Sequence, residues 1–156
     1  MDSRTRRMMG HGAIVMFIGL AAGFGLVMSL IGGFELIPGS IISFDIPGDP
    51  RAWARAHMGG IMNGMLVILF ALFIHVASLP ERQAGRLYWM LVGTGYANTA
   101  FYYGGLLSPS RALTFGDNPV GSSNIFGIIG LLPALIFAFV LMLATVEVAR
   151  WAFNRD

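Results

Sequence analysis

A small set of polar side chains lies inside otherwise apolar stretches of the sequence, and these are the residues that could do chemistry. The set comprises His11, His57, Asn63, His75, Thr94, Tyr96, Asn98, Thr99, Tyr102 and Tyr103. A polar group at membrane depth is costly, so each one is first treated as a functional candidate. Imidazole can bind a metal or a cofactor, while amide and phenol groups can hold a polar atom of a substrate.

Depth along the expected helices brings four of these residues together. At about 1.5 Å per residue, His57 lies roughly 6 Å and Asn63 roughly 15 Å below the outer face of the membrane. Tyr102 lies roughly 8 Å and Asn98 roughly 14 Å below the same face, on one side of their helix. His57 and Asn63 point about 120° apart, so they would flank a wide, flat ligand and not converge on one small ion.

The elements that must position these residues are membrane helices. Of the 156 residues, 56% are hydrophobic and 12% are charged, whereas a soluble domain carries about 25% charged residues. A spanning helix needs about 20 apolar residues. The sequence therefore predicts an all-α integral membrane protein, a bundle of four helices at approximately 12–33, 53–79, 87–108 and 122–147, in one domain of residues 1–156.

The charged residues predict the orientation of this bundle and exclude some functions. Arg4, Arg6, Arg7, Arg82, Arg86, Arg150 and Arg155 fall on the side of the termini, and Arg51, Arg55 and Arg111 fall on the other side. Positive residues favour the cytoplasm, so both termini are expected inside. The long connections at 34–50 and 108–123 are then outside, where loops of this length often cover or form a binding site. With no cysteine and a net charge of +2, neither a thiolate metal site nor nucleic-acid binding is expected.

Each candidate residue also has a purely structural interpretation. His11 and His75 are explained equally well as side chains at helix ends, and both lie too far from His57 to share a metal with it in one chain. Asn63 and Asn98 can hydrogen-bond a neighbouring helix and do nothing more. From the residues alone, a ligand role and a structural role for His57 are both open.

Several short motifs resemble, in their order and spacing, those of bacterial styrene oxide isomerases. They are Gly10-His11-Gly12, Gly32-Gly33-Phe34-Glu35, Ile37-Pro38-Gly39, Trp53-Ala54-Arg55-Ala56-His57, Asn63-Gly64, Phe101-Tyr102, Ser108-Pro109 and Leu113-Thr114-Phe115-Gly116. Each motif is weak by itself. The Trp-Ala-Arg-Ala-His and Asn-Gly pair, followed by Phe-Tyr and Leu-Thr-Phe-Gly at this spacing, is specific, and the resemblance covers nearly the whole chain.

The resemblance implies a multi-pass enzyme of the bacterial inner membrane that assembles as a homotrimer, with ferric haem b between its protomers. His57 would be the axial ligand of the haem iron, and Asn63 and Tyr102 would line the open face of the iron where an aryl epoxide binds. The implied reaction is the redox-neutral Meinwald rearrangement of styrene oxide to phenylacetaldehyde through a 1,2-hydride shift. A styrene monooxygenase is a candidate upstream partner.

Supporting roles follow for residues around this expected site. Asn98, on the same helix face as Tyr102, is a candidate supporting partner of Tyr102 and is also counted among the cofactor-binding residues with His57 and Arg55. Arg51, Arg55 or Arg111 is a candidate to pair with haem propionates, because the guanidinium fork matches a carboxylate. A role as a plain surface residue explains each of these arginines equally well.

The sequence departs from the family pattern at Met58, Asn124, Gly104 and Gly105. We expect these positions near the pocket, where they bear on which epoxide is preferred. Two other functions stay open. One is a haem-binding electron-transfer protein, which normally has two strong axial ligands. The other is a cofactor-free channel or structural membrane subunit.

Overall fold

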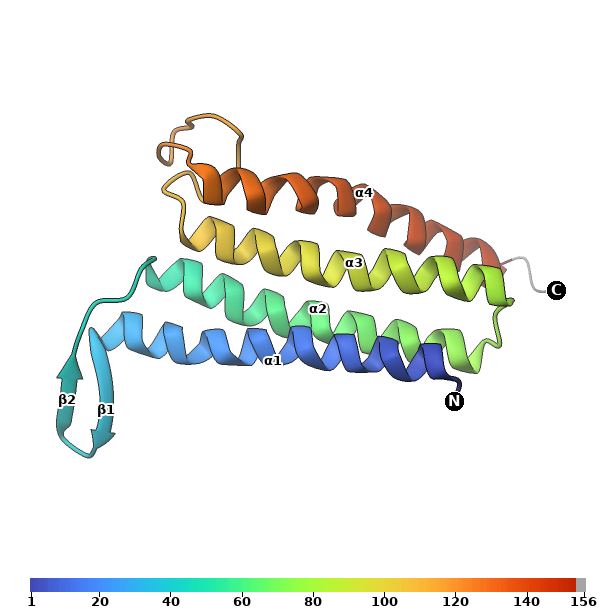
Figure 1. Ribbon diagram of the computed structural model, residues 1–156, viewed down its shortest axis with the longest axis horizontal. Helices are drawn as coiled ribbons and strands as arrows, with labels where there is room; N and C mark the ends of the chain where they lie inside the picture. The colour runs from blue at the N-terminus through green and yellow to red at the C-terminus, as the bar shows by residue number, and fades with distance from the viewer. Residues whose placement is uncertain (154–156) are drawn as a thin grey trace.

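The computed structural model describes residues 1–153, and Arg155, one of the arginines used for the orientation, lies outside the described residues. The chain forms four long helices, which are α1 (Ser3–Ile31), α2 (Pro50–Val76), α3 (Glu81–Leu106) and α4 (Ile125–Phe153). Neighbouring helices run antiparallel, and the start of α1 and the end of α4 lie at the same end of the molecule (Figure 1). The predicted helical fold class is confirmed, apart from one short hairpin.

Three of the four helices, α1, α2 and α4, are long and apolar enough to cross a membrane. α3 has a comparable length of 26 residues but carries more polar side chains along it. Large apolar side chains such as Phe17, Phe24 and Phe139 are exposed on the outer faces of α1 and α4. Exposure of apolar surface on this scale is unusual for a soluble monomer and indicates a membrane protein.

Short polar and glycine signals set the helix ends. Asp2 and Asp49 each accept a hydrogen bond from a backbone N–H in the first turn of α1 and α2, which satisfies a group that the helix leaves unpaired. Pro50 then begins α2, a position where its missing N–H costs nothing. Gly32, with a left-handed φ of 65°, ends α1. The first helix therefore ends at Ile31, before the predicted boundary at 33.

The connection after α1, predicted as an irregular loop, contains a β-hairpin. β1 (Gly33–Ile37) pairs with β2 (Ser40–Ser43) in antiparallel fashion. Gly39 makes the turn with a φ of 83°. The hairpin projects from the end of the helices opposite to the start of α1 (Figure 1). The strand sequences Gly-Phe-Glu-Leu-Ile and Ser-Ile-Ile-Ser do not continue a strict alternation of apolar and polar residues, so the pattern that marks a strand in sequence is missing.

The helices pack in two pairs, α1 on α2 and α3 on α4, with a smaller contact between α2 and α3. Glycines bring the first pair into backbone contact, because Gly12 faces Gly64 and Gly19 faces Gly60. A Cβ at Gly19 would lie 2.5 Å from the backbone nitrogen of Ile61. Small residues permit this close approach between membrane helices.

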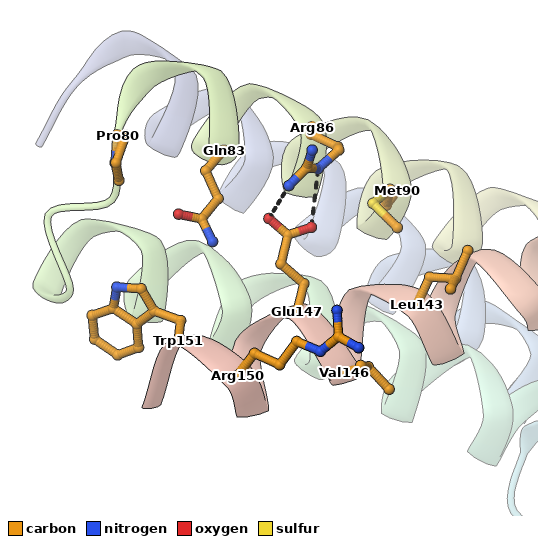
Figure 2. Close-up of a pocket in the computed structure, with 9 residues that line it drawn as sticks. All are labelled: Pro80, Gln83, Arg86, Met90, Leu143, Val146, Glu147, Arg150 and Trp151. Atoms are coloured by element: carbon orange, nitrogen blue, oxygen red, sulfur yellow. Dashed lines mark hydrogen bonds and ion pairs between the residues drawn. The ribbon is translucent and has the colours of Figure 1, made fainter. Parts of the chain in front are cut away.

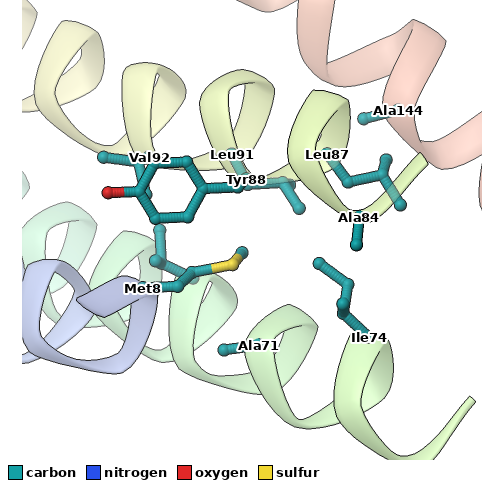
Figure 3. Packing of buried hydrophobic residues seen from close by; sticks show 10 residues of the cluster. Met8, Ala71, Ile74, Ala84, Leu87, Tyr88, Leu91, Val92 and Ala144 are labelled. Atoms are coloured by element: carbon teal, nitrogen blue, oxygen red, sulfur yellow. The ribbon is translucent and has the colours of Figure 1, made fainter. Parts of the chain in front are cut away.

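The apolar core lies in the half of the molecule near the start of α1 and the end of α4. Its buried side chains interlock between the helices (Figure 3) and comprise Met8, Val67, Ala71, Ile74, Ala84, Leu87, Tyr88, Leu91, Val92 and Ala144. The other half of the α2–α3 contact holds the polar side chains Asn63, Asn98 and Tyr102. The apolar core and this polar cluster therefore lie in opposite halves of the bundle.

Replacing Gly19 by alanine is expected to lower the free energy of unfolding by about 1–3 kcal/mol, the usual cost of overpacking. The added Cβ would meet the backbone of Gly60 and Ile61, which cannot move aside as a flexible side chain would. Thermal unfolding in detergent, followed by circular dichroism without added haem, measures the effect. Gly10→Ala is the control, since nothing lies within 4 Å of its Cβ position. Equal melting temperatures for the two variants would contradict the close α1–α2 contact.

Candidate functional site

A chain of hydrogen bonds joins three of the predicted site residues between α2 and α3. The Asn98 amide donates to Asn63 Oδ1 at 2.7 Å. The Asn63 amide donates to the Gly59 carbonyl at 2.7 Å and to the Tyr102 hydroxyl oxygen at 3.3 Å. Asn63 is only 8% exposed, so its polar atoms depend on these partners, since an unpaired buried amide costs about 1–3 kcal/mol.

The Tyr102 hydroxyl group has a proton to give. Its oxygen accepts from Asn63, and within residues 1–153 its own hydrogen has no acceptor. The ring lies directly against Gly59 on α2, where a Cβ would stand 2.6 Å from the hydroxyl oxygen. The lack of a side chain at Gly59 therefore leaves the space that the phenol ring occupies, and the hydrogen bond from Asn63 orients the hydroxyl group. Such a hydroxyl can donate to an oxygen that gains negative charge.

His57 faces α1, and its ring is oriented by the backbone of that helix. Its Nδ1 lies 2.9 Å from the Gly19 carbonyl oxygen. A carbonyl only accepts, so Nδ1 carries a proton, and in the neutral ring the lone pair is then on Nε2. Gly23 leaves room for the ring, because a Cβ there would lie 2.9 Å from Nδ1. Metal-binding histidines commonly donate their second nitrogen to a carbonyl or a carboxylate in this way, so the orientation of His57 is compatible with a ligand role.

The structure thus brings Asn63, Asn98 and Tyr102 together but does not join His57 to them within one chain. His57 contacts α1 through Gly19, whereas the other three residues lie between α2 and α3. Asn98 is the predicted supporting partner of Tyr102, and it reaches Tyr102 through Asn63, whose Oδ1 accepts the hydrogen bond from the Asn98 amide.

The three arginines near the hairpin end of the helices differ in whether their guanidinium groups already have partners. Arg55 Nε is buried and has no hydrogen-bond partner within residues 1–153, and the guanidinium lies 5.9 Å from the centre of the Phe101 ring. Arg111 is already paired with Asp49 at 3.2 Å. Arg51 is exposed. Of the three, Arg55 is the one with a buried donor that a bound carboxylate would satisfy.

The other two histidines lie apart from these residues. His11 Nδ1 lies 2.9 Å from the Tyr96 hydroxyl, between α1 and α3, and His75 is exposed near the end of α2. In the part of the chain that the structure describes, no three His, Asp or Glu side chains gather around one point. These positions agree with the structural interpretation of His11 and His75.

The departures from the family pattern have structural explanations away from the Asn63–Tyr102 contact. A Cβ at Gly104 would lie 2.5 Å from the Phe126 carbonyl on α4, and one at Gly105 would lie 2.8 Å from the Arg111 carbonyl. Gly104 lets α3 approach α4, and Gly105 lets α3 approach the following loop beside Arg55, whose guanidinium nitrogen would lie 3.2 Å from the added Cβ. That these positions lie near the pocket stays a prediction. Asn124 accepts from the Gly127 N–H and donates to the Leu107 carbonyl, and a carboxylate could make only the first bond.

Two residues that orient His57 were not found by the sequence analysis. Gly19 supplies the carbonyl for Nδ1, and Gly23 supplies the space. Their spacing of four places both on one side of α1. That pattern of small residues on one helix face was an available signal for the space at Gly23, but not for the carbonyl bond from Gly19.

The loop contact near this end predicts an acid-dependent stability. The Ala52 N–H donates to Asp49 and lowers the pKa of that carboxyl below its ordinary value of 3.8, and the Arg111 charge lowers it further while burial opposes the shift. A folded-state pKa below the unfolded one gives stability that is present above the unfolded pKa and is lost as the pH falls through the folded pKa. We expect the melting temperature to fall below about pH 4.

Asp49→Asn tests this expectation, because asparagine still caps a helix but does not titrate. Its melting temperature should depend less on pH between about pH 5 and pH 3 than that of the wild type. Asp45→Asn, in an exposed part of the same loop, is the control. A wild-type acid dependence that persists in Asp49→Asn would assign it to another group.

Comparison with known proteins places the chain in a family. Residues 4–153 match the family described as styrene oxide isomerase. The chain is 42% identical to "Styrene-oxide isomerase" of Pseudomonas fluorescens over 137 residues, which cover 88% of this chain and 81% of that protein. It is also 27% identical to "Hydroxylaminobenzene mutase HabA" of Ectopseudomonas oleovorans over 127 residues, which cover 76% of this chain and 90% of that protein. As the sequence motifs predicted, the chain belongs to the styrene oxide isomerase family and is an isomerase.

Proposed function

We propose that this protein converts an aryl epoxide into an aldehyde, with styrene oxide giving phenylacetaldehyde. The observation that carries the proposal is the 42% identity to a styrene-oxide isomerase over most of the chain. The site supports it through the Tyr102 hydroxyl, which is oriented by Asn63 and is free to donate to an oxygen. An isomerase needs neither a second axial ligand nor a conduction path, so the electron-transfer and channel functions are set aside.

The proposed setting is the bacterial inner membrane, which all four helices cross with both termini in the cytoplasm. The start of α1 and the end of α4 lie at one end (Figure 1), together with Arg4, Arg82, Arg86 and Arg150. Positive residues favour the cytoplasmic side. A short turn between α2 and α3 at that end and the long connections at the other end agree with this topology.

A homotrimer is part of the proposal, and the position of His57 supports association between chains. His57 lies on the α1 side of α2, whereas Tyr102 and Asn63 lie on the α3 side. A site that needs both His57 and Tyr102 could take His57 from one copy of the chain and Tyr102 from a neighbouring copy. α4 also has large apolar side chains exposed along its length, which leaves surface for a neighbouring copy or for lipid.

The residues present fit haem b as the resident cofactor. His57 offers an Nε2 lone pair with Nδ1 held by Gly19, and the unpartnered buried Nε of Arg55 fits a propionate carboxylate. His57 would hold the iron, and Arg55 would hold the carboxylate. When bound, ferric haem supplies a Lewis acid that polarises the epoxide C–O bond.

The protein's own groups then control an intramolecular rearrangement. The benzylic C–O bond breaks, a hydride moves from the terminal carbon to the benzylic carbon, and the terminal carbon becomes the aldehyde, so no atom or electron is gained. Tyr102 donates its hydroxyl proton as a hydrogen bond to the oxygen while negative charge grows there. Asn63 holds Tyr102 in this direction, and Asn98 holds Asn63. Apolar surroundings exclude water, which would otherwise trap the cation as a diol.

Styrene oxide carrying two deuterium atoms on its terminal carbon tests the reaction. We expect the haem-loaded protein in detergent to give phenylacetaldehyde with one deuterium on the benzylic carbon and one on the aldehyde carbon, read by gas chromatography with mass spectrometry. Heat-denatured protein with the same haem is the control. Formation of the diol, or of an aldehyde that has exchanged its label with solvent, would contradict the hydride shift.

A further inference from the structure

A cavity of about 720 Å³ lies between α3 and α4 (Figure 2). Its residues belong to the start of α3 and the end of α4, at the end of the molecule opposite to the β-hairpin (Figure 1). Its lining residues are Pro80, Gln83, Arg86, Met90, Leu143, Val146, Glu147, Arg150 and Trp151. None of these residues takes part in the Asn98–Asn63–Tyr102 chain or in the His57 contact. No step of the proposed reaction uses this cavity.

The polarity of the lining changes along the cavity. On α3 it runs from Gln83 and Arg86, near the start of the helix, to Met90 deeper in. On α4 it runs from Arg150 near the end of the helix back to Leu143. At about 1.5 Å per residue, the cavity extends roughly 10–15 Å along the helices. One end is therefore polar, and the end toward the middle of the helices is apolar, which fits an amphiphile.

An ion pair organises the polar end. Arg86 bonds to Glu147 through two contacts of 3.0 and 2.5 Å, from Nε and from the terminal amino group. Figure 2 shows this pair bridging α3 and α4 across the cavity. The Glu147 side chain is 16% exposed and that of Arg86 is 57% exposed. The opposite charges of Arg86 and Glu147 cancel, and the pair holds α3 and α4 together across the cavity. Any net charge of the lining must therefore come from another residue.

That residue is Arg150, the remaining charged residue of the lining. It has no hydrogen bond or ion pair within residues 1–153, although Glu147 stands one helical turn before it. The Gln83 amide is a further polar group in the same lining. One unneutralised guanidinium beside an amide favours an anionic oxygen ligand. The aryl epoxide of the proposed reaction is neutral, so this positive charge would not strengthen its binding by ion pairing.

We propose that the cavity binds one anionic phospholipid from the surrounding bilayer. The headgroup phosphate pairs with Arg150 and Gln83, and an acyl chain lies along Met90 and Leu143. The predicted span 87–108 begins between Arg86 and Met90, so the polar end of the cavity is at headgroup level and the apolar end is at the level of the hydrocarbon. Basic pockets between membrane helices on the cytoplasmic side bind such headgroups.

Native mass spectrometry of the detergent-purified protein tests the site. The protein is mixed with equal amounts of phosphatidylglycerol and phosphatidylcholine that carry identical acyl chains. We expect wild type to retain phosphatidylglycerol over phosphatidylcholine by about fivefold, the preference that one arginine near an anionic headgroup provides. In Arg150→Gln the ratio should fall close to one. Arg82→Gln, with the same charge change on an exposed residue outside the lining, should keep the wild-type ratio.

Three results would overturn the proposal. The first is equal retention of the two lipids by wild type, which would mean only general lipid coverage. The second is an equal loss of preference in Arg82→Gln and Arg150→Gln, which would mean only net charge. The third is displacement of phosphatidylglycerol from wild type by an excess of inorganic phosphate, which would mean a site for a free anion. None of these readouts uses haem or turnover, so the outcome is independent of the proposed reaction.

Discussion

His57→Ala is expected to remove the Soret band of haem from the purified protein and to lower phenylacetaldehyde formation by at least about 100-fold. Loss of a group that merely orients a metal ligand already costs about 10–100-fold in metal affinity, so loss of the ligand itself should cost more. His11 cannot replace His57, because it bonds to Tyr96 between α1 and α3. The measurements are the optical spectrum of protein made with ample haem and the rate of aldehyde formation.

His75→Ala is the matched control, because it removes an exposed histidine from the same helix. It should keep both the Soret band and the rate. A wild-type Soret band in His57→Ala would mean that another residue ligates the iron. Loss of haem with full activity would instead remove the cofactor from the reaction and leave the chemistry to the protein's own groups.

Tyr102→Phe is expected to lower kcat by about 100-fold while the haem spectrum stays unchanged. Removing one preorganised donor to a developing oxyanion costs about 10²–10³ in kcat, and Tyr102 is the donor that Asn63 orients. The phenylalanine ring keeps the contact with Gly59, so the shape of the site is retained. Steady-state rates with styrene oxide and an optical spectrum of the same preparation measure the two properties.

The neighbouring tyrosine is the control for this substitution. Tyr103 donates its hydroxyl hydrogen to the Ile18 carbonyl on α1, so Tyr103→Phe removes a structural bond and should leave kcat near the wild-type value. If Tyr102→Phe turned over normally, Tyr102 would have no role as a donor. If both variants slowed equally, the effect would come from helix packing and not from the hydroxyl group.

Depth along the helices predicted that His57, Asn63, Asn98 and Tyr102 lie at one level of the bundle, because each residue adds about 1.5 Å of rise. The structure joins Asn63, Asn98 and Tyr102 by hydrogen bonds between α2 and α3. His57 lies at the same level but bonds to the Gly19 carbonyl on α1, so depth alone did not predict which neighbouring helix it contacts. The order of the bonds was not predictable, because it depends on which amide oxygen lies within reach.

The sequence did not predict that His57 contacts the Gly19 carbonyl, nor that the outer loop contains a β-hairpin. Gly19 acts through its carbonyl group, and a backbone atom has no residue-type signal. The roles of Gly104 and Gly105 depend on the approach of α4 and the Arg111 loop, which are contacts between segments distant in the sequence. The hairpin depends on Gly39, whose positive φ makes a turn between two very short strands.

The pairing of α1 with α2 and of α3 with α4 makes the chain two helical hairpins that meet along a seam. Asn63 belongs to the first hairpin, and both Asn98 and Tyr102 belong to the second, so the bonds between them cross this seam. Neither hairpin alone contains the oriented phenol. The site therefore comes into being only when the two halves dock, and a small sliding of one half against the other would misdirect Tyr102 before it disturbed either hairpin. If Tyr102 acts as proposed, the reaction depends on the docking of the two hairpins, and a chain whose hairpins are folded but undocked would be inactive.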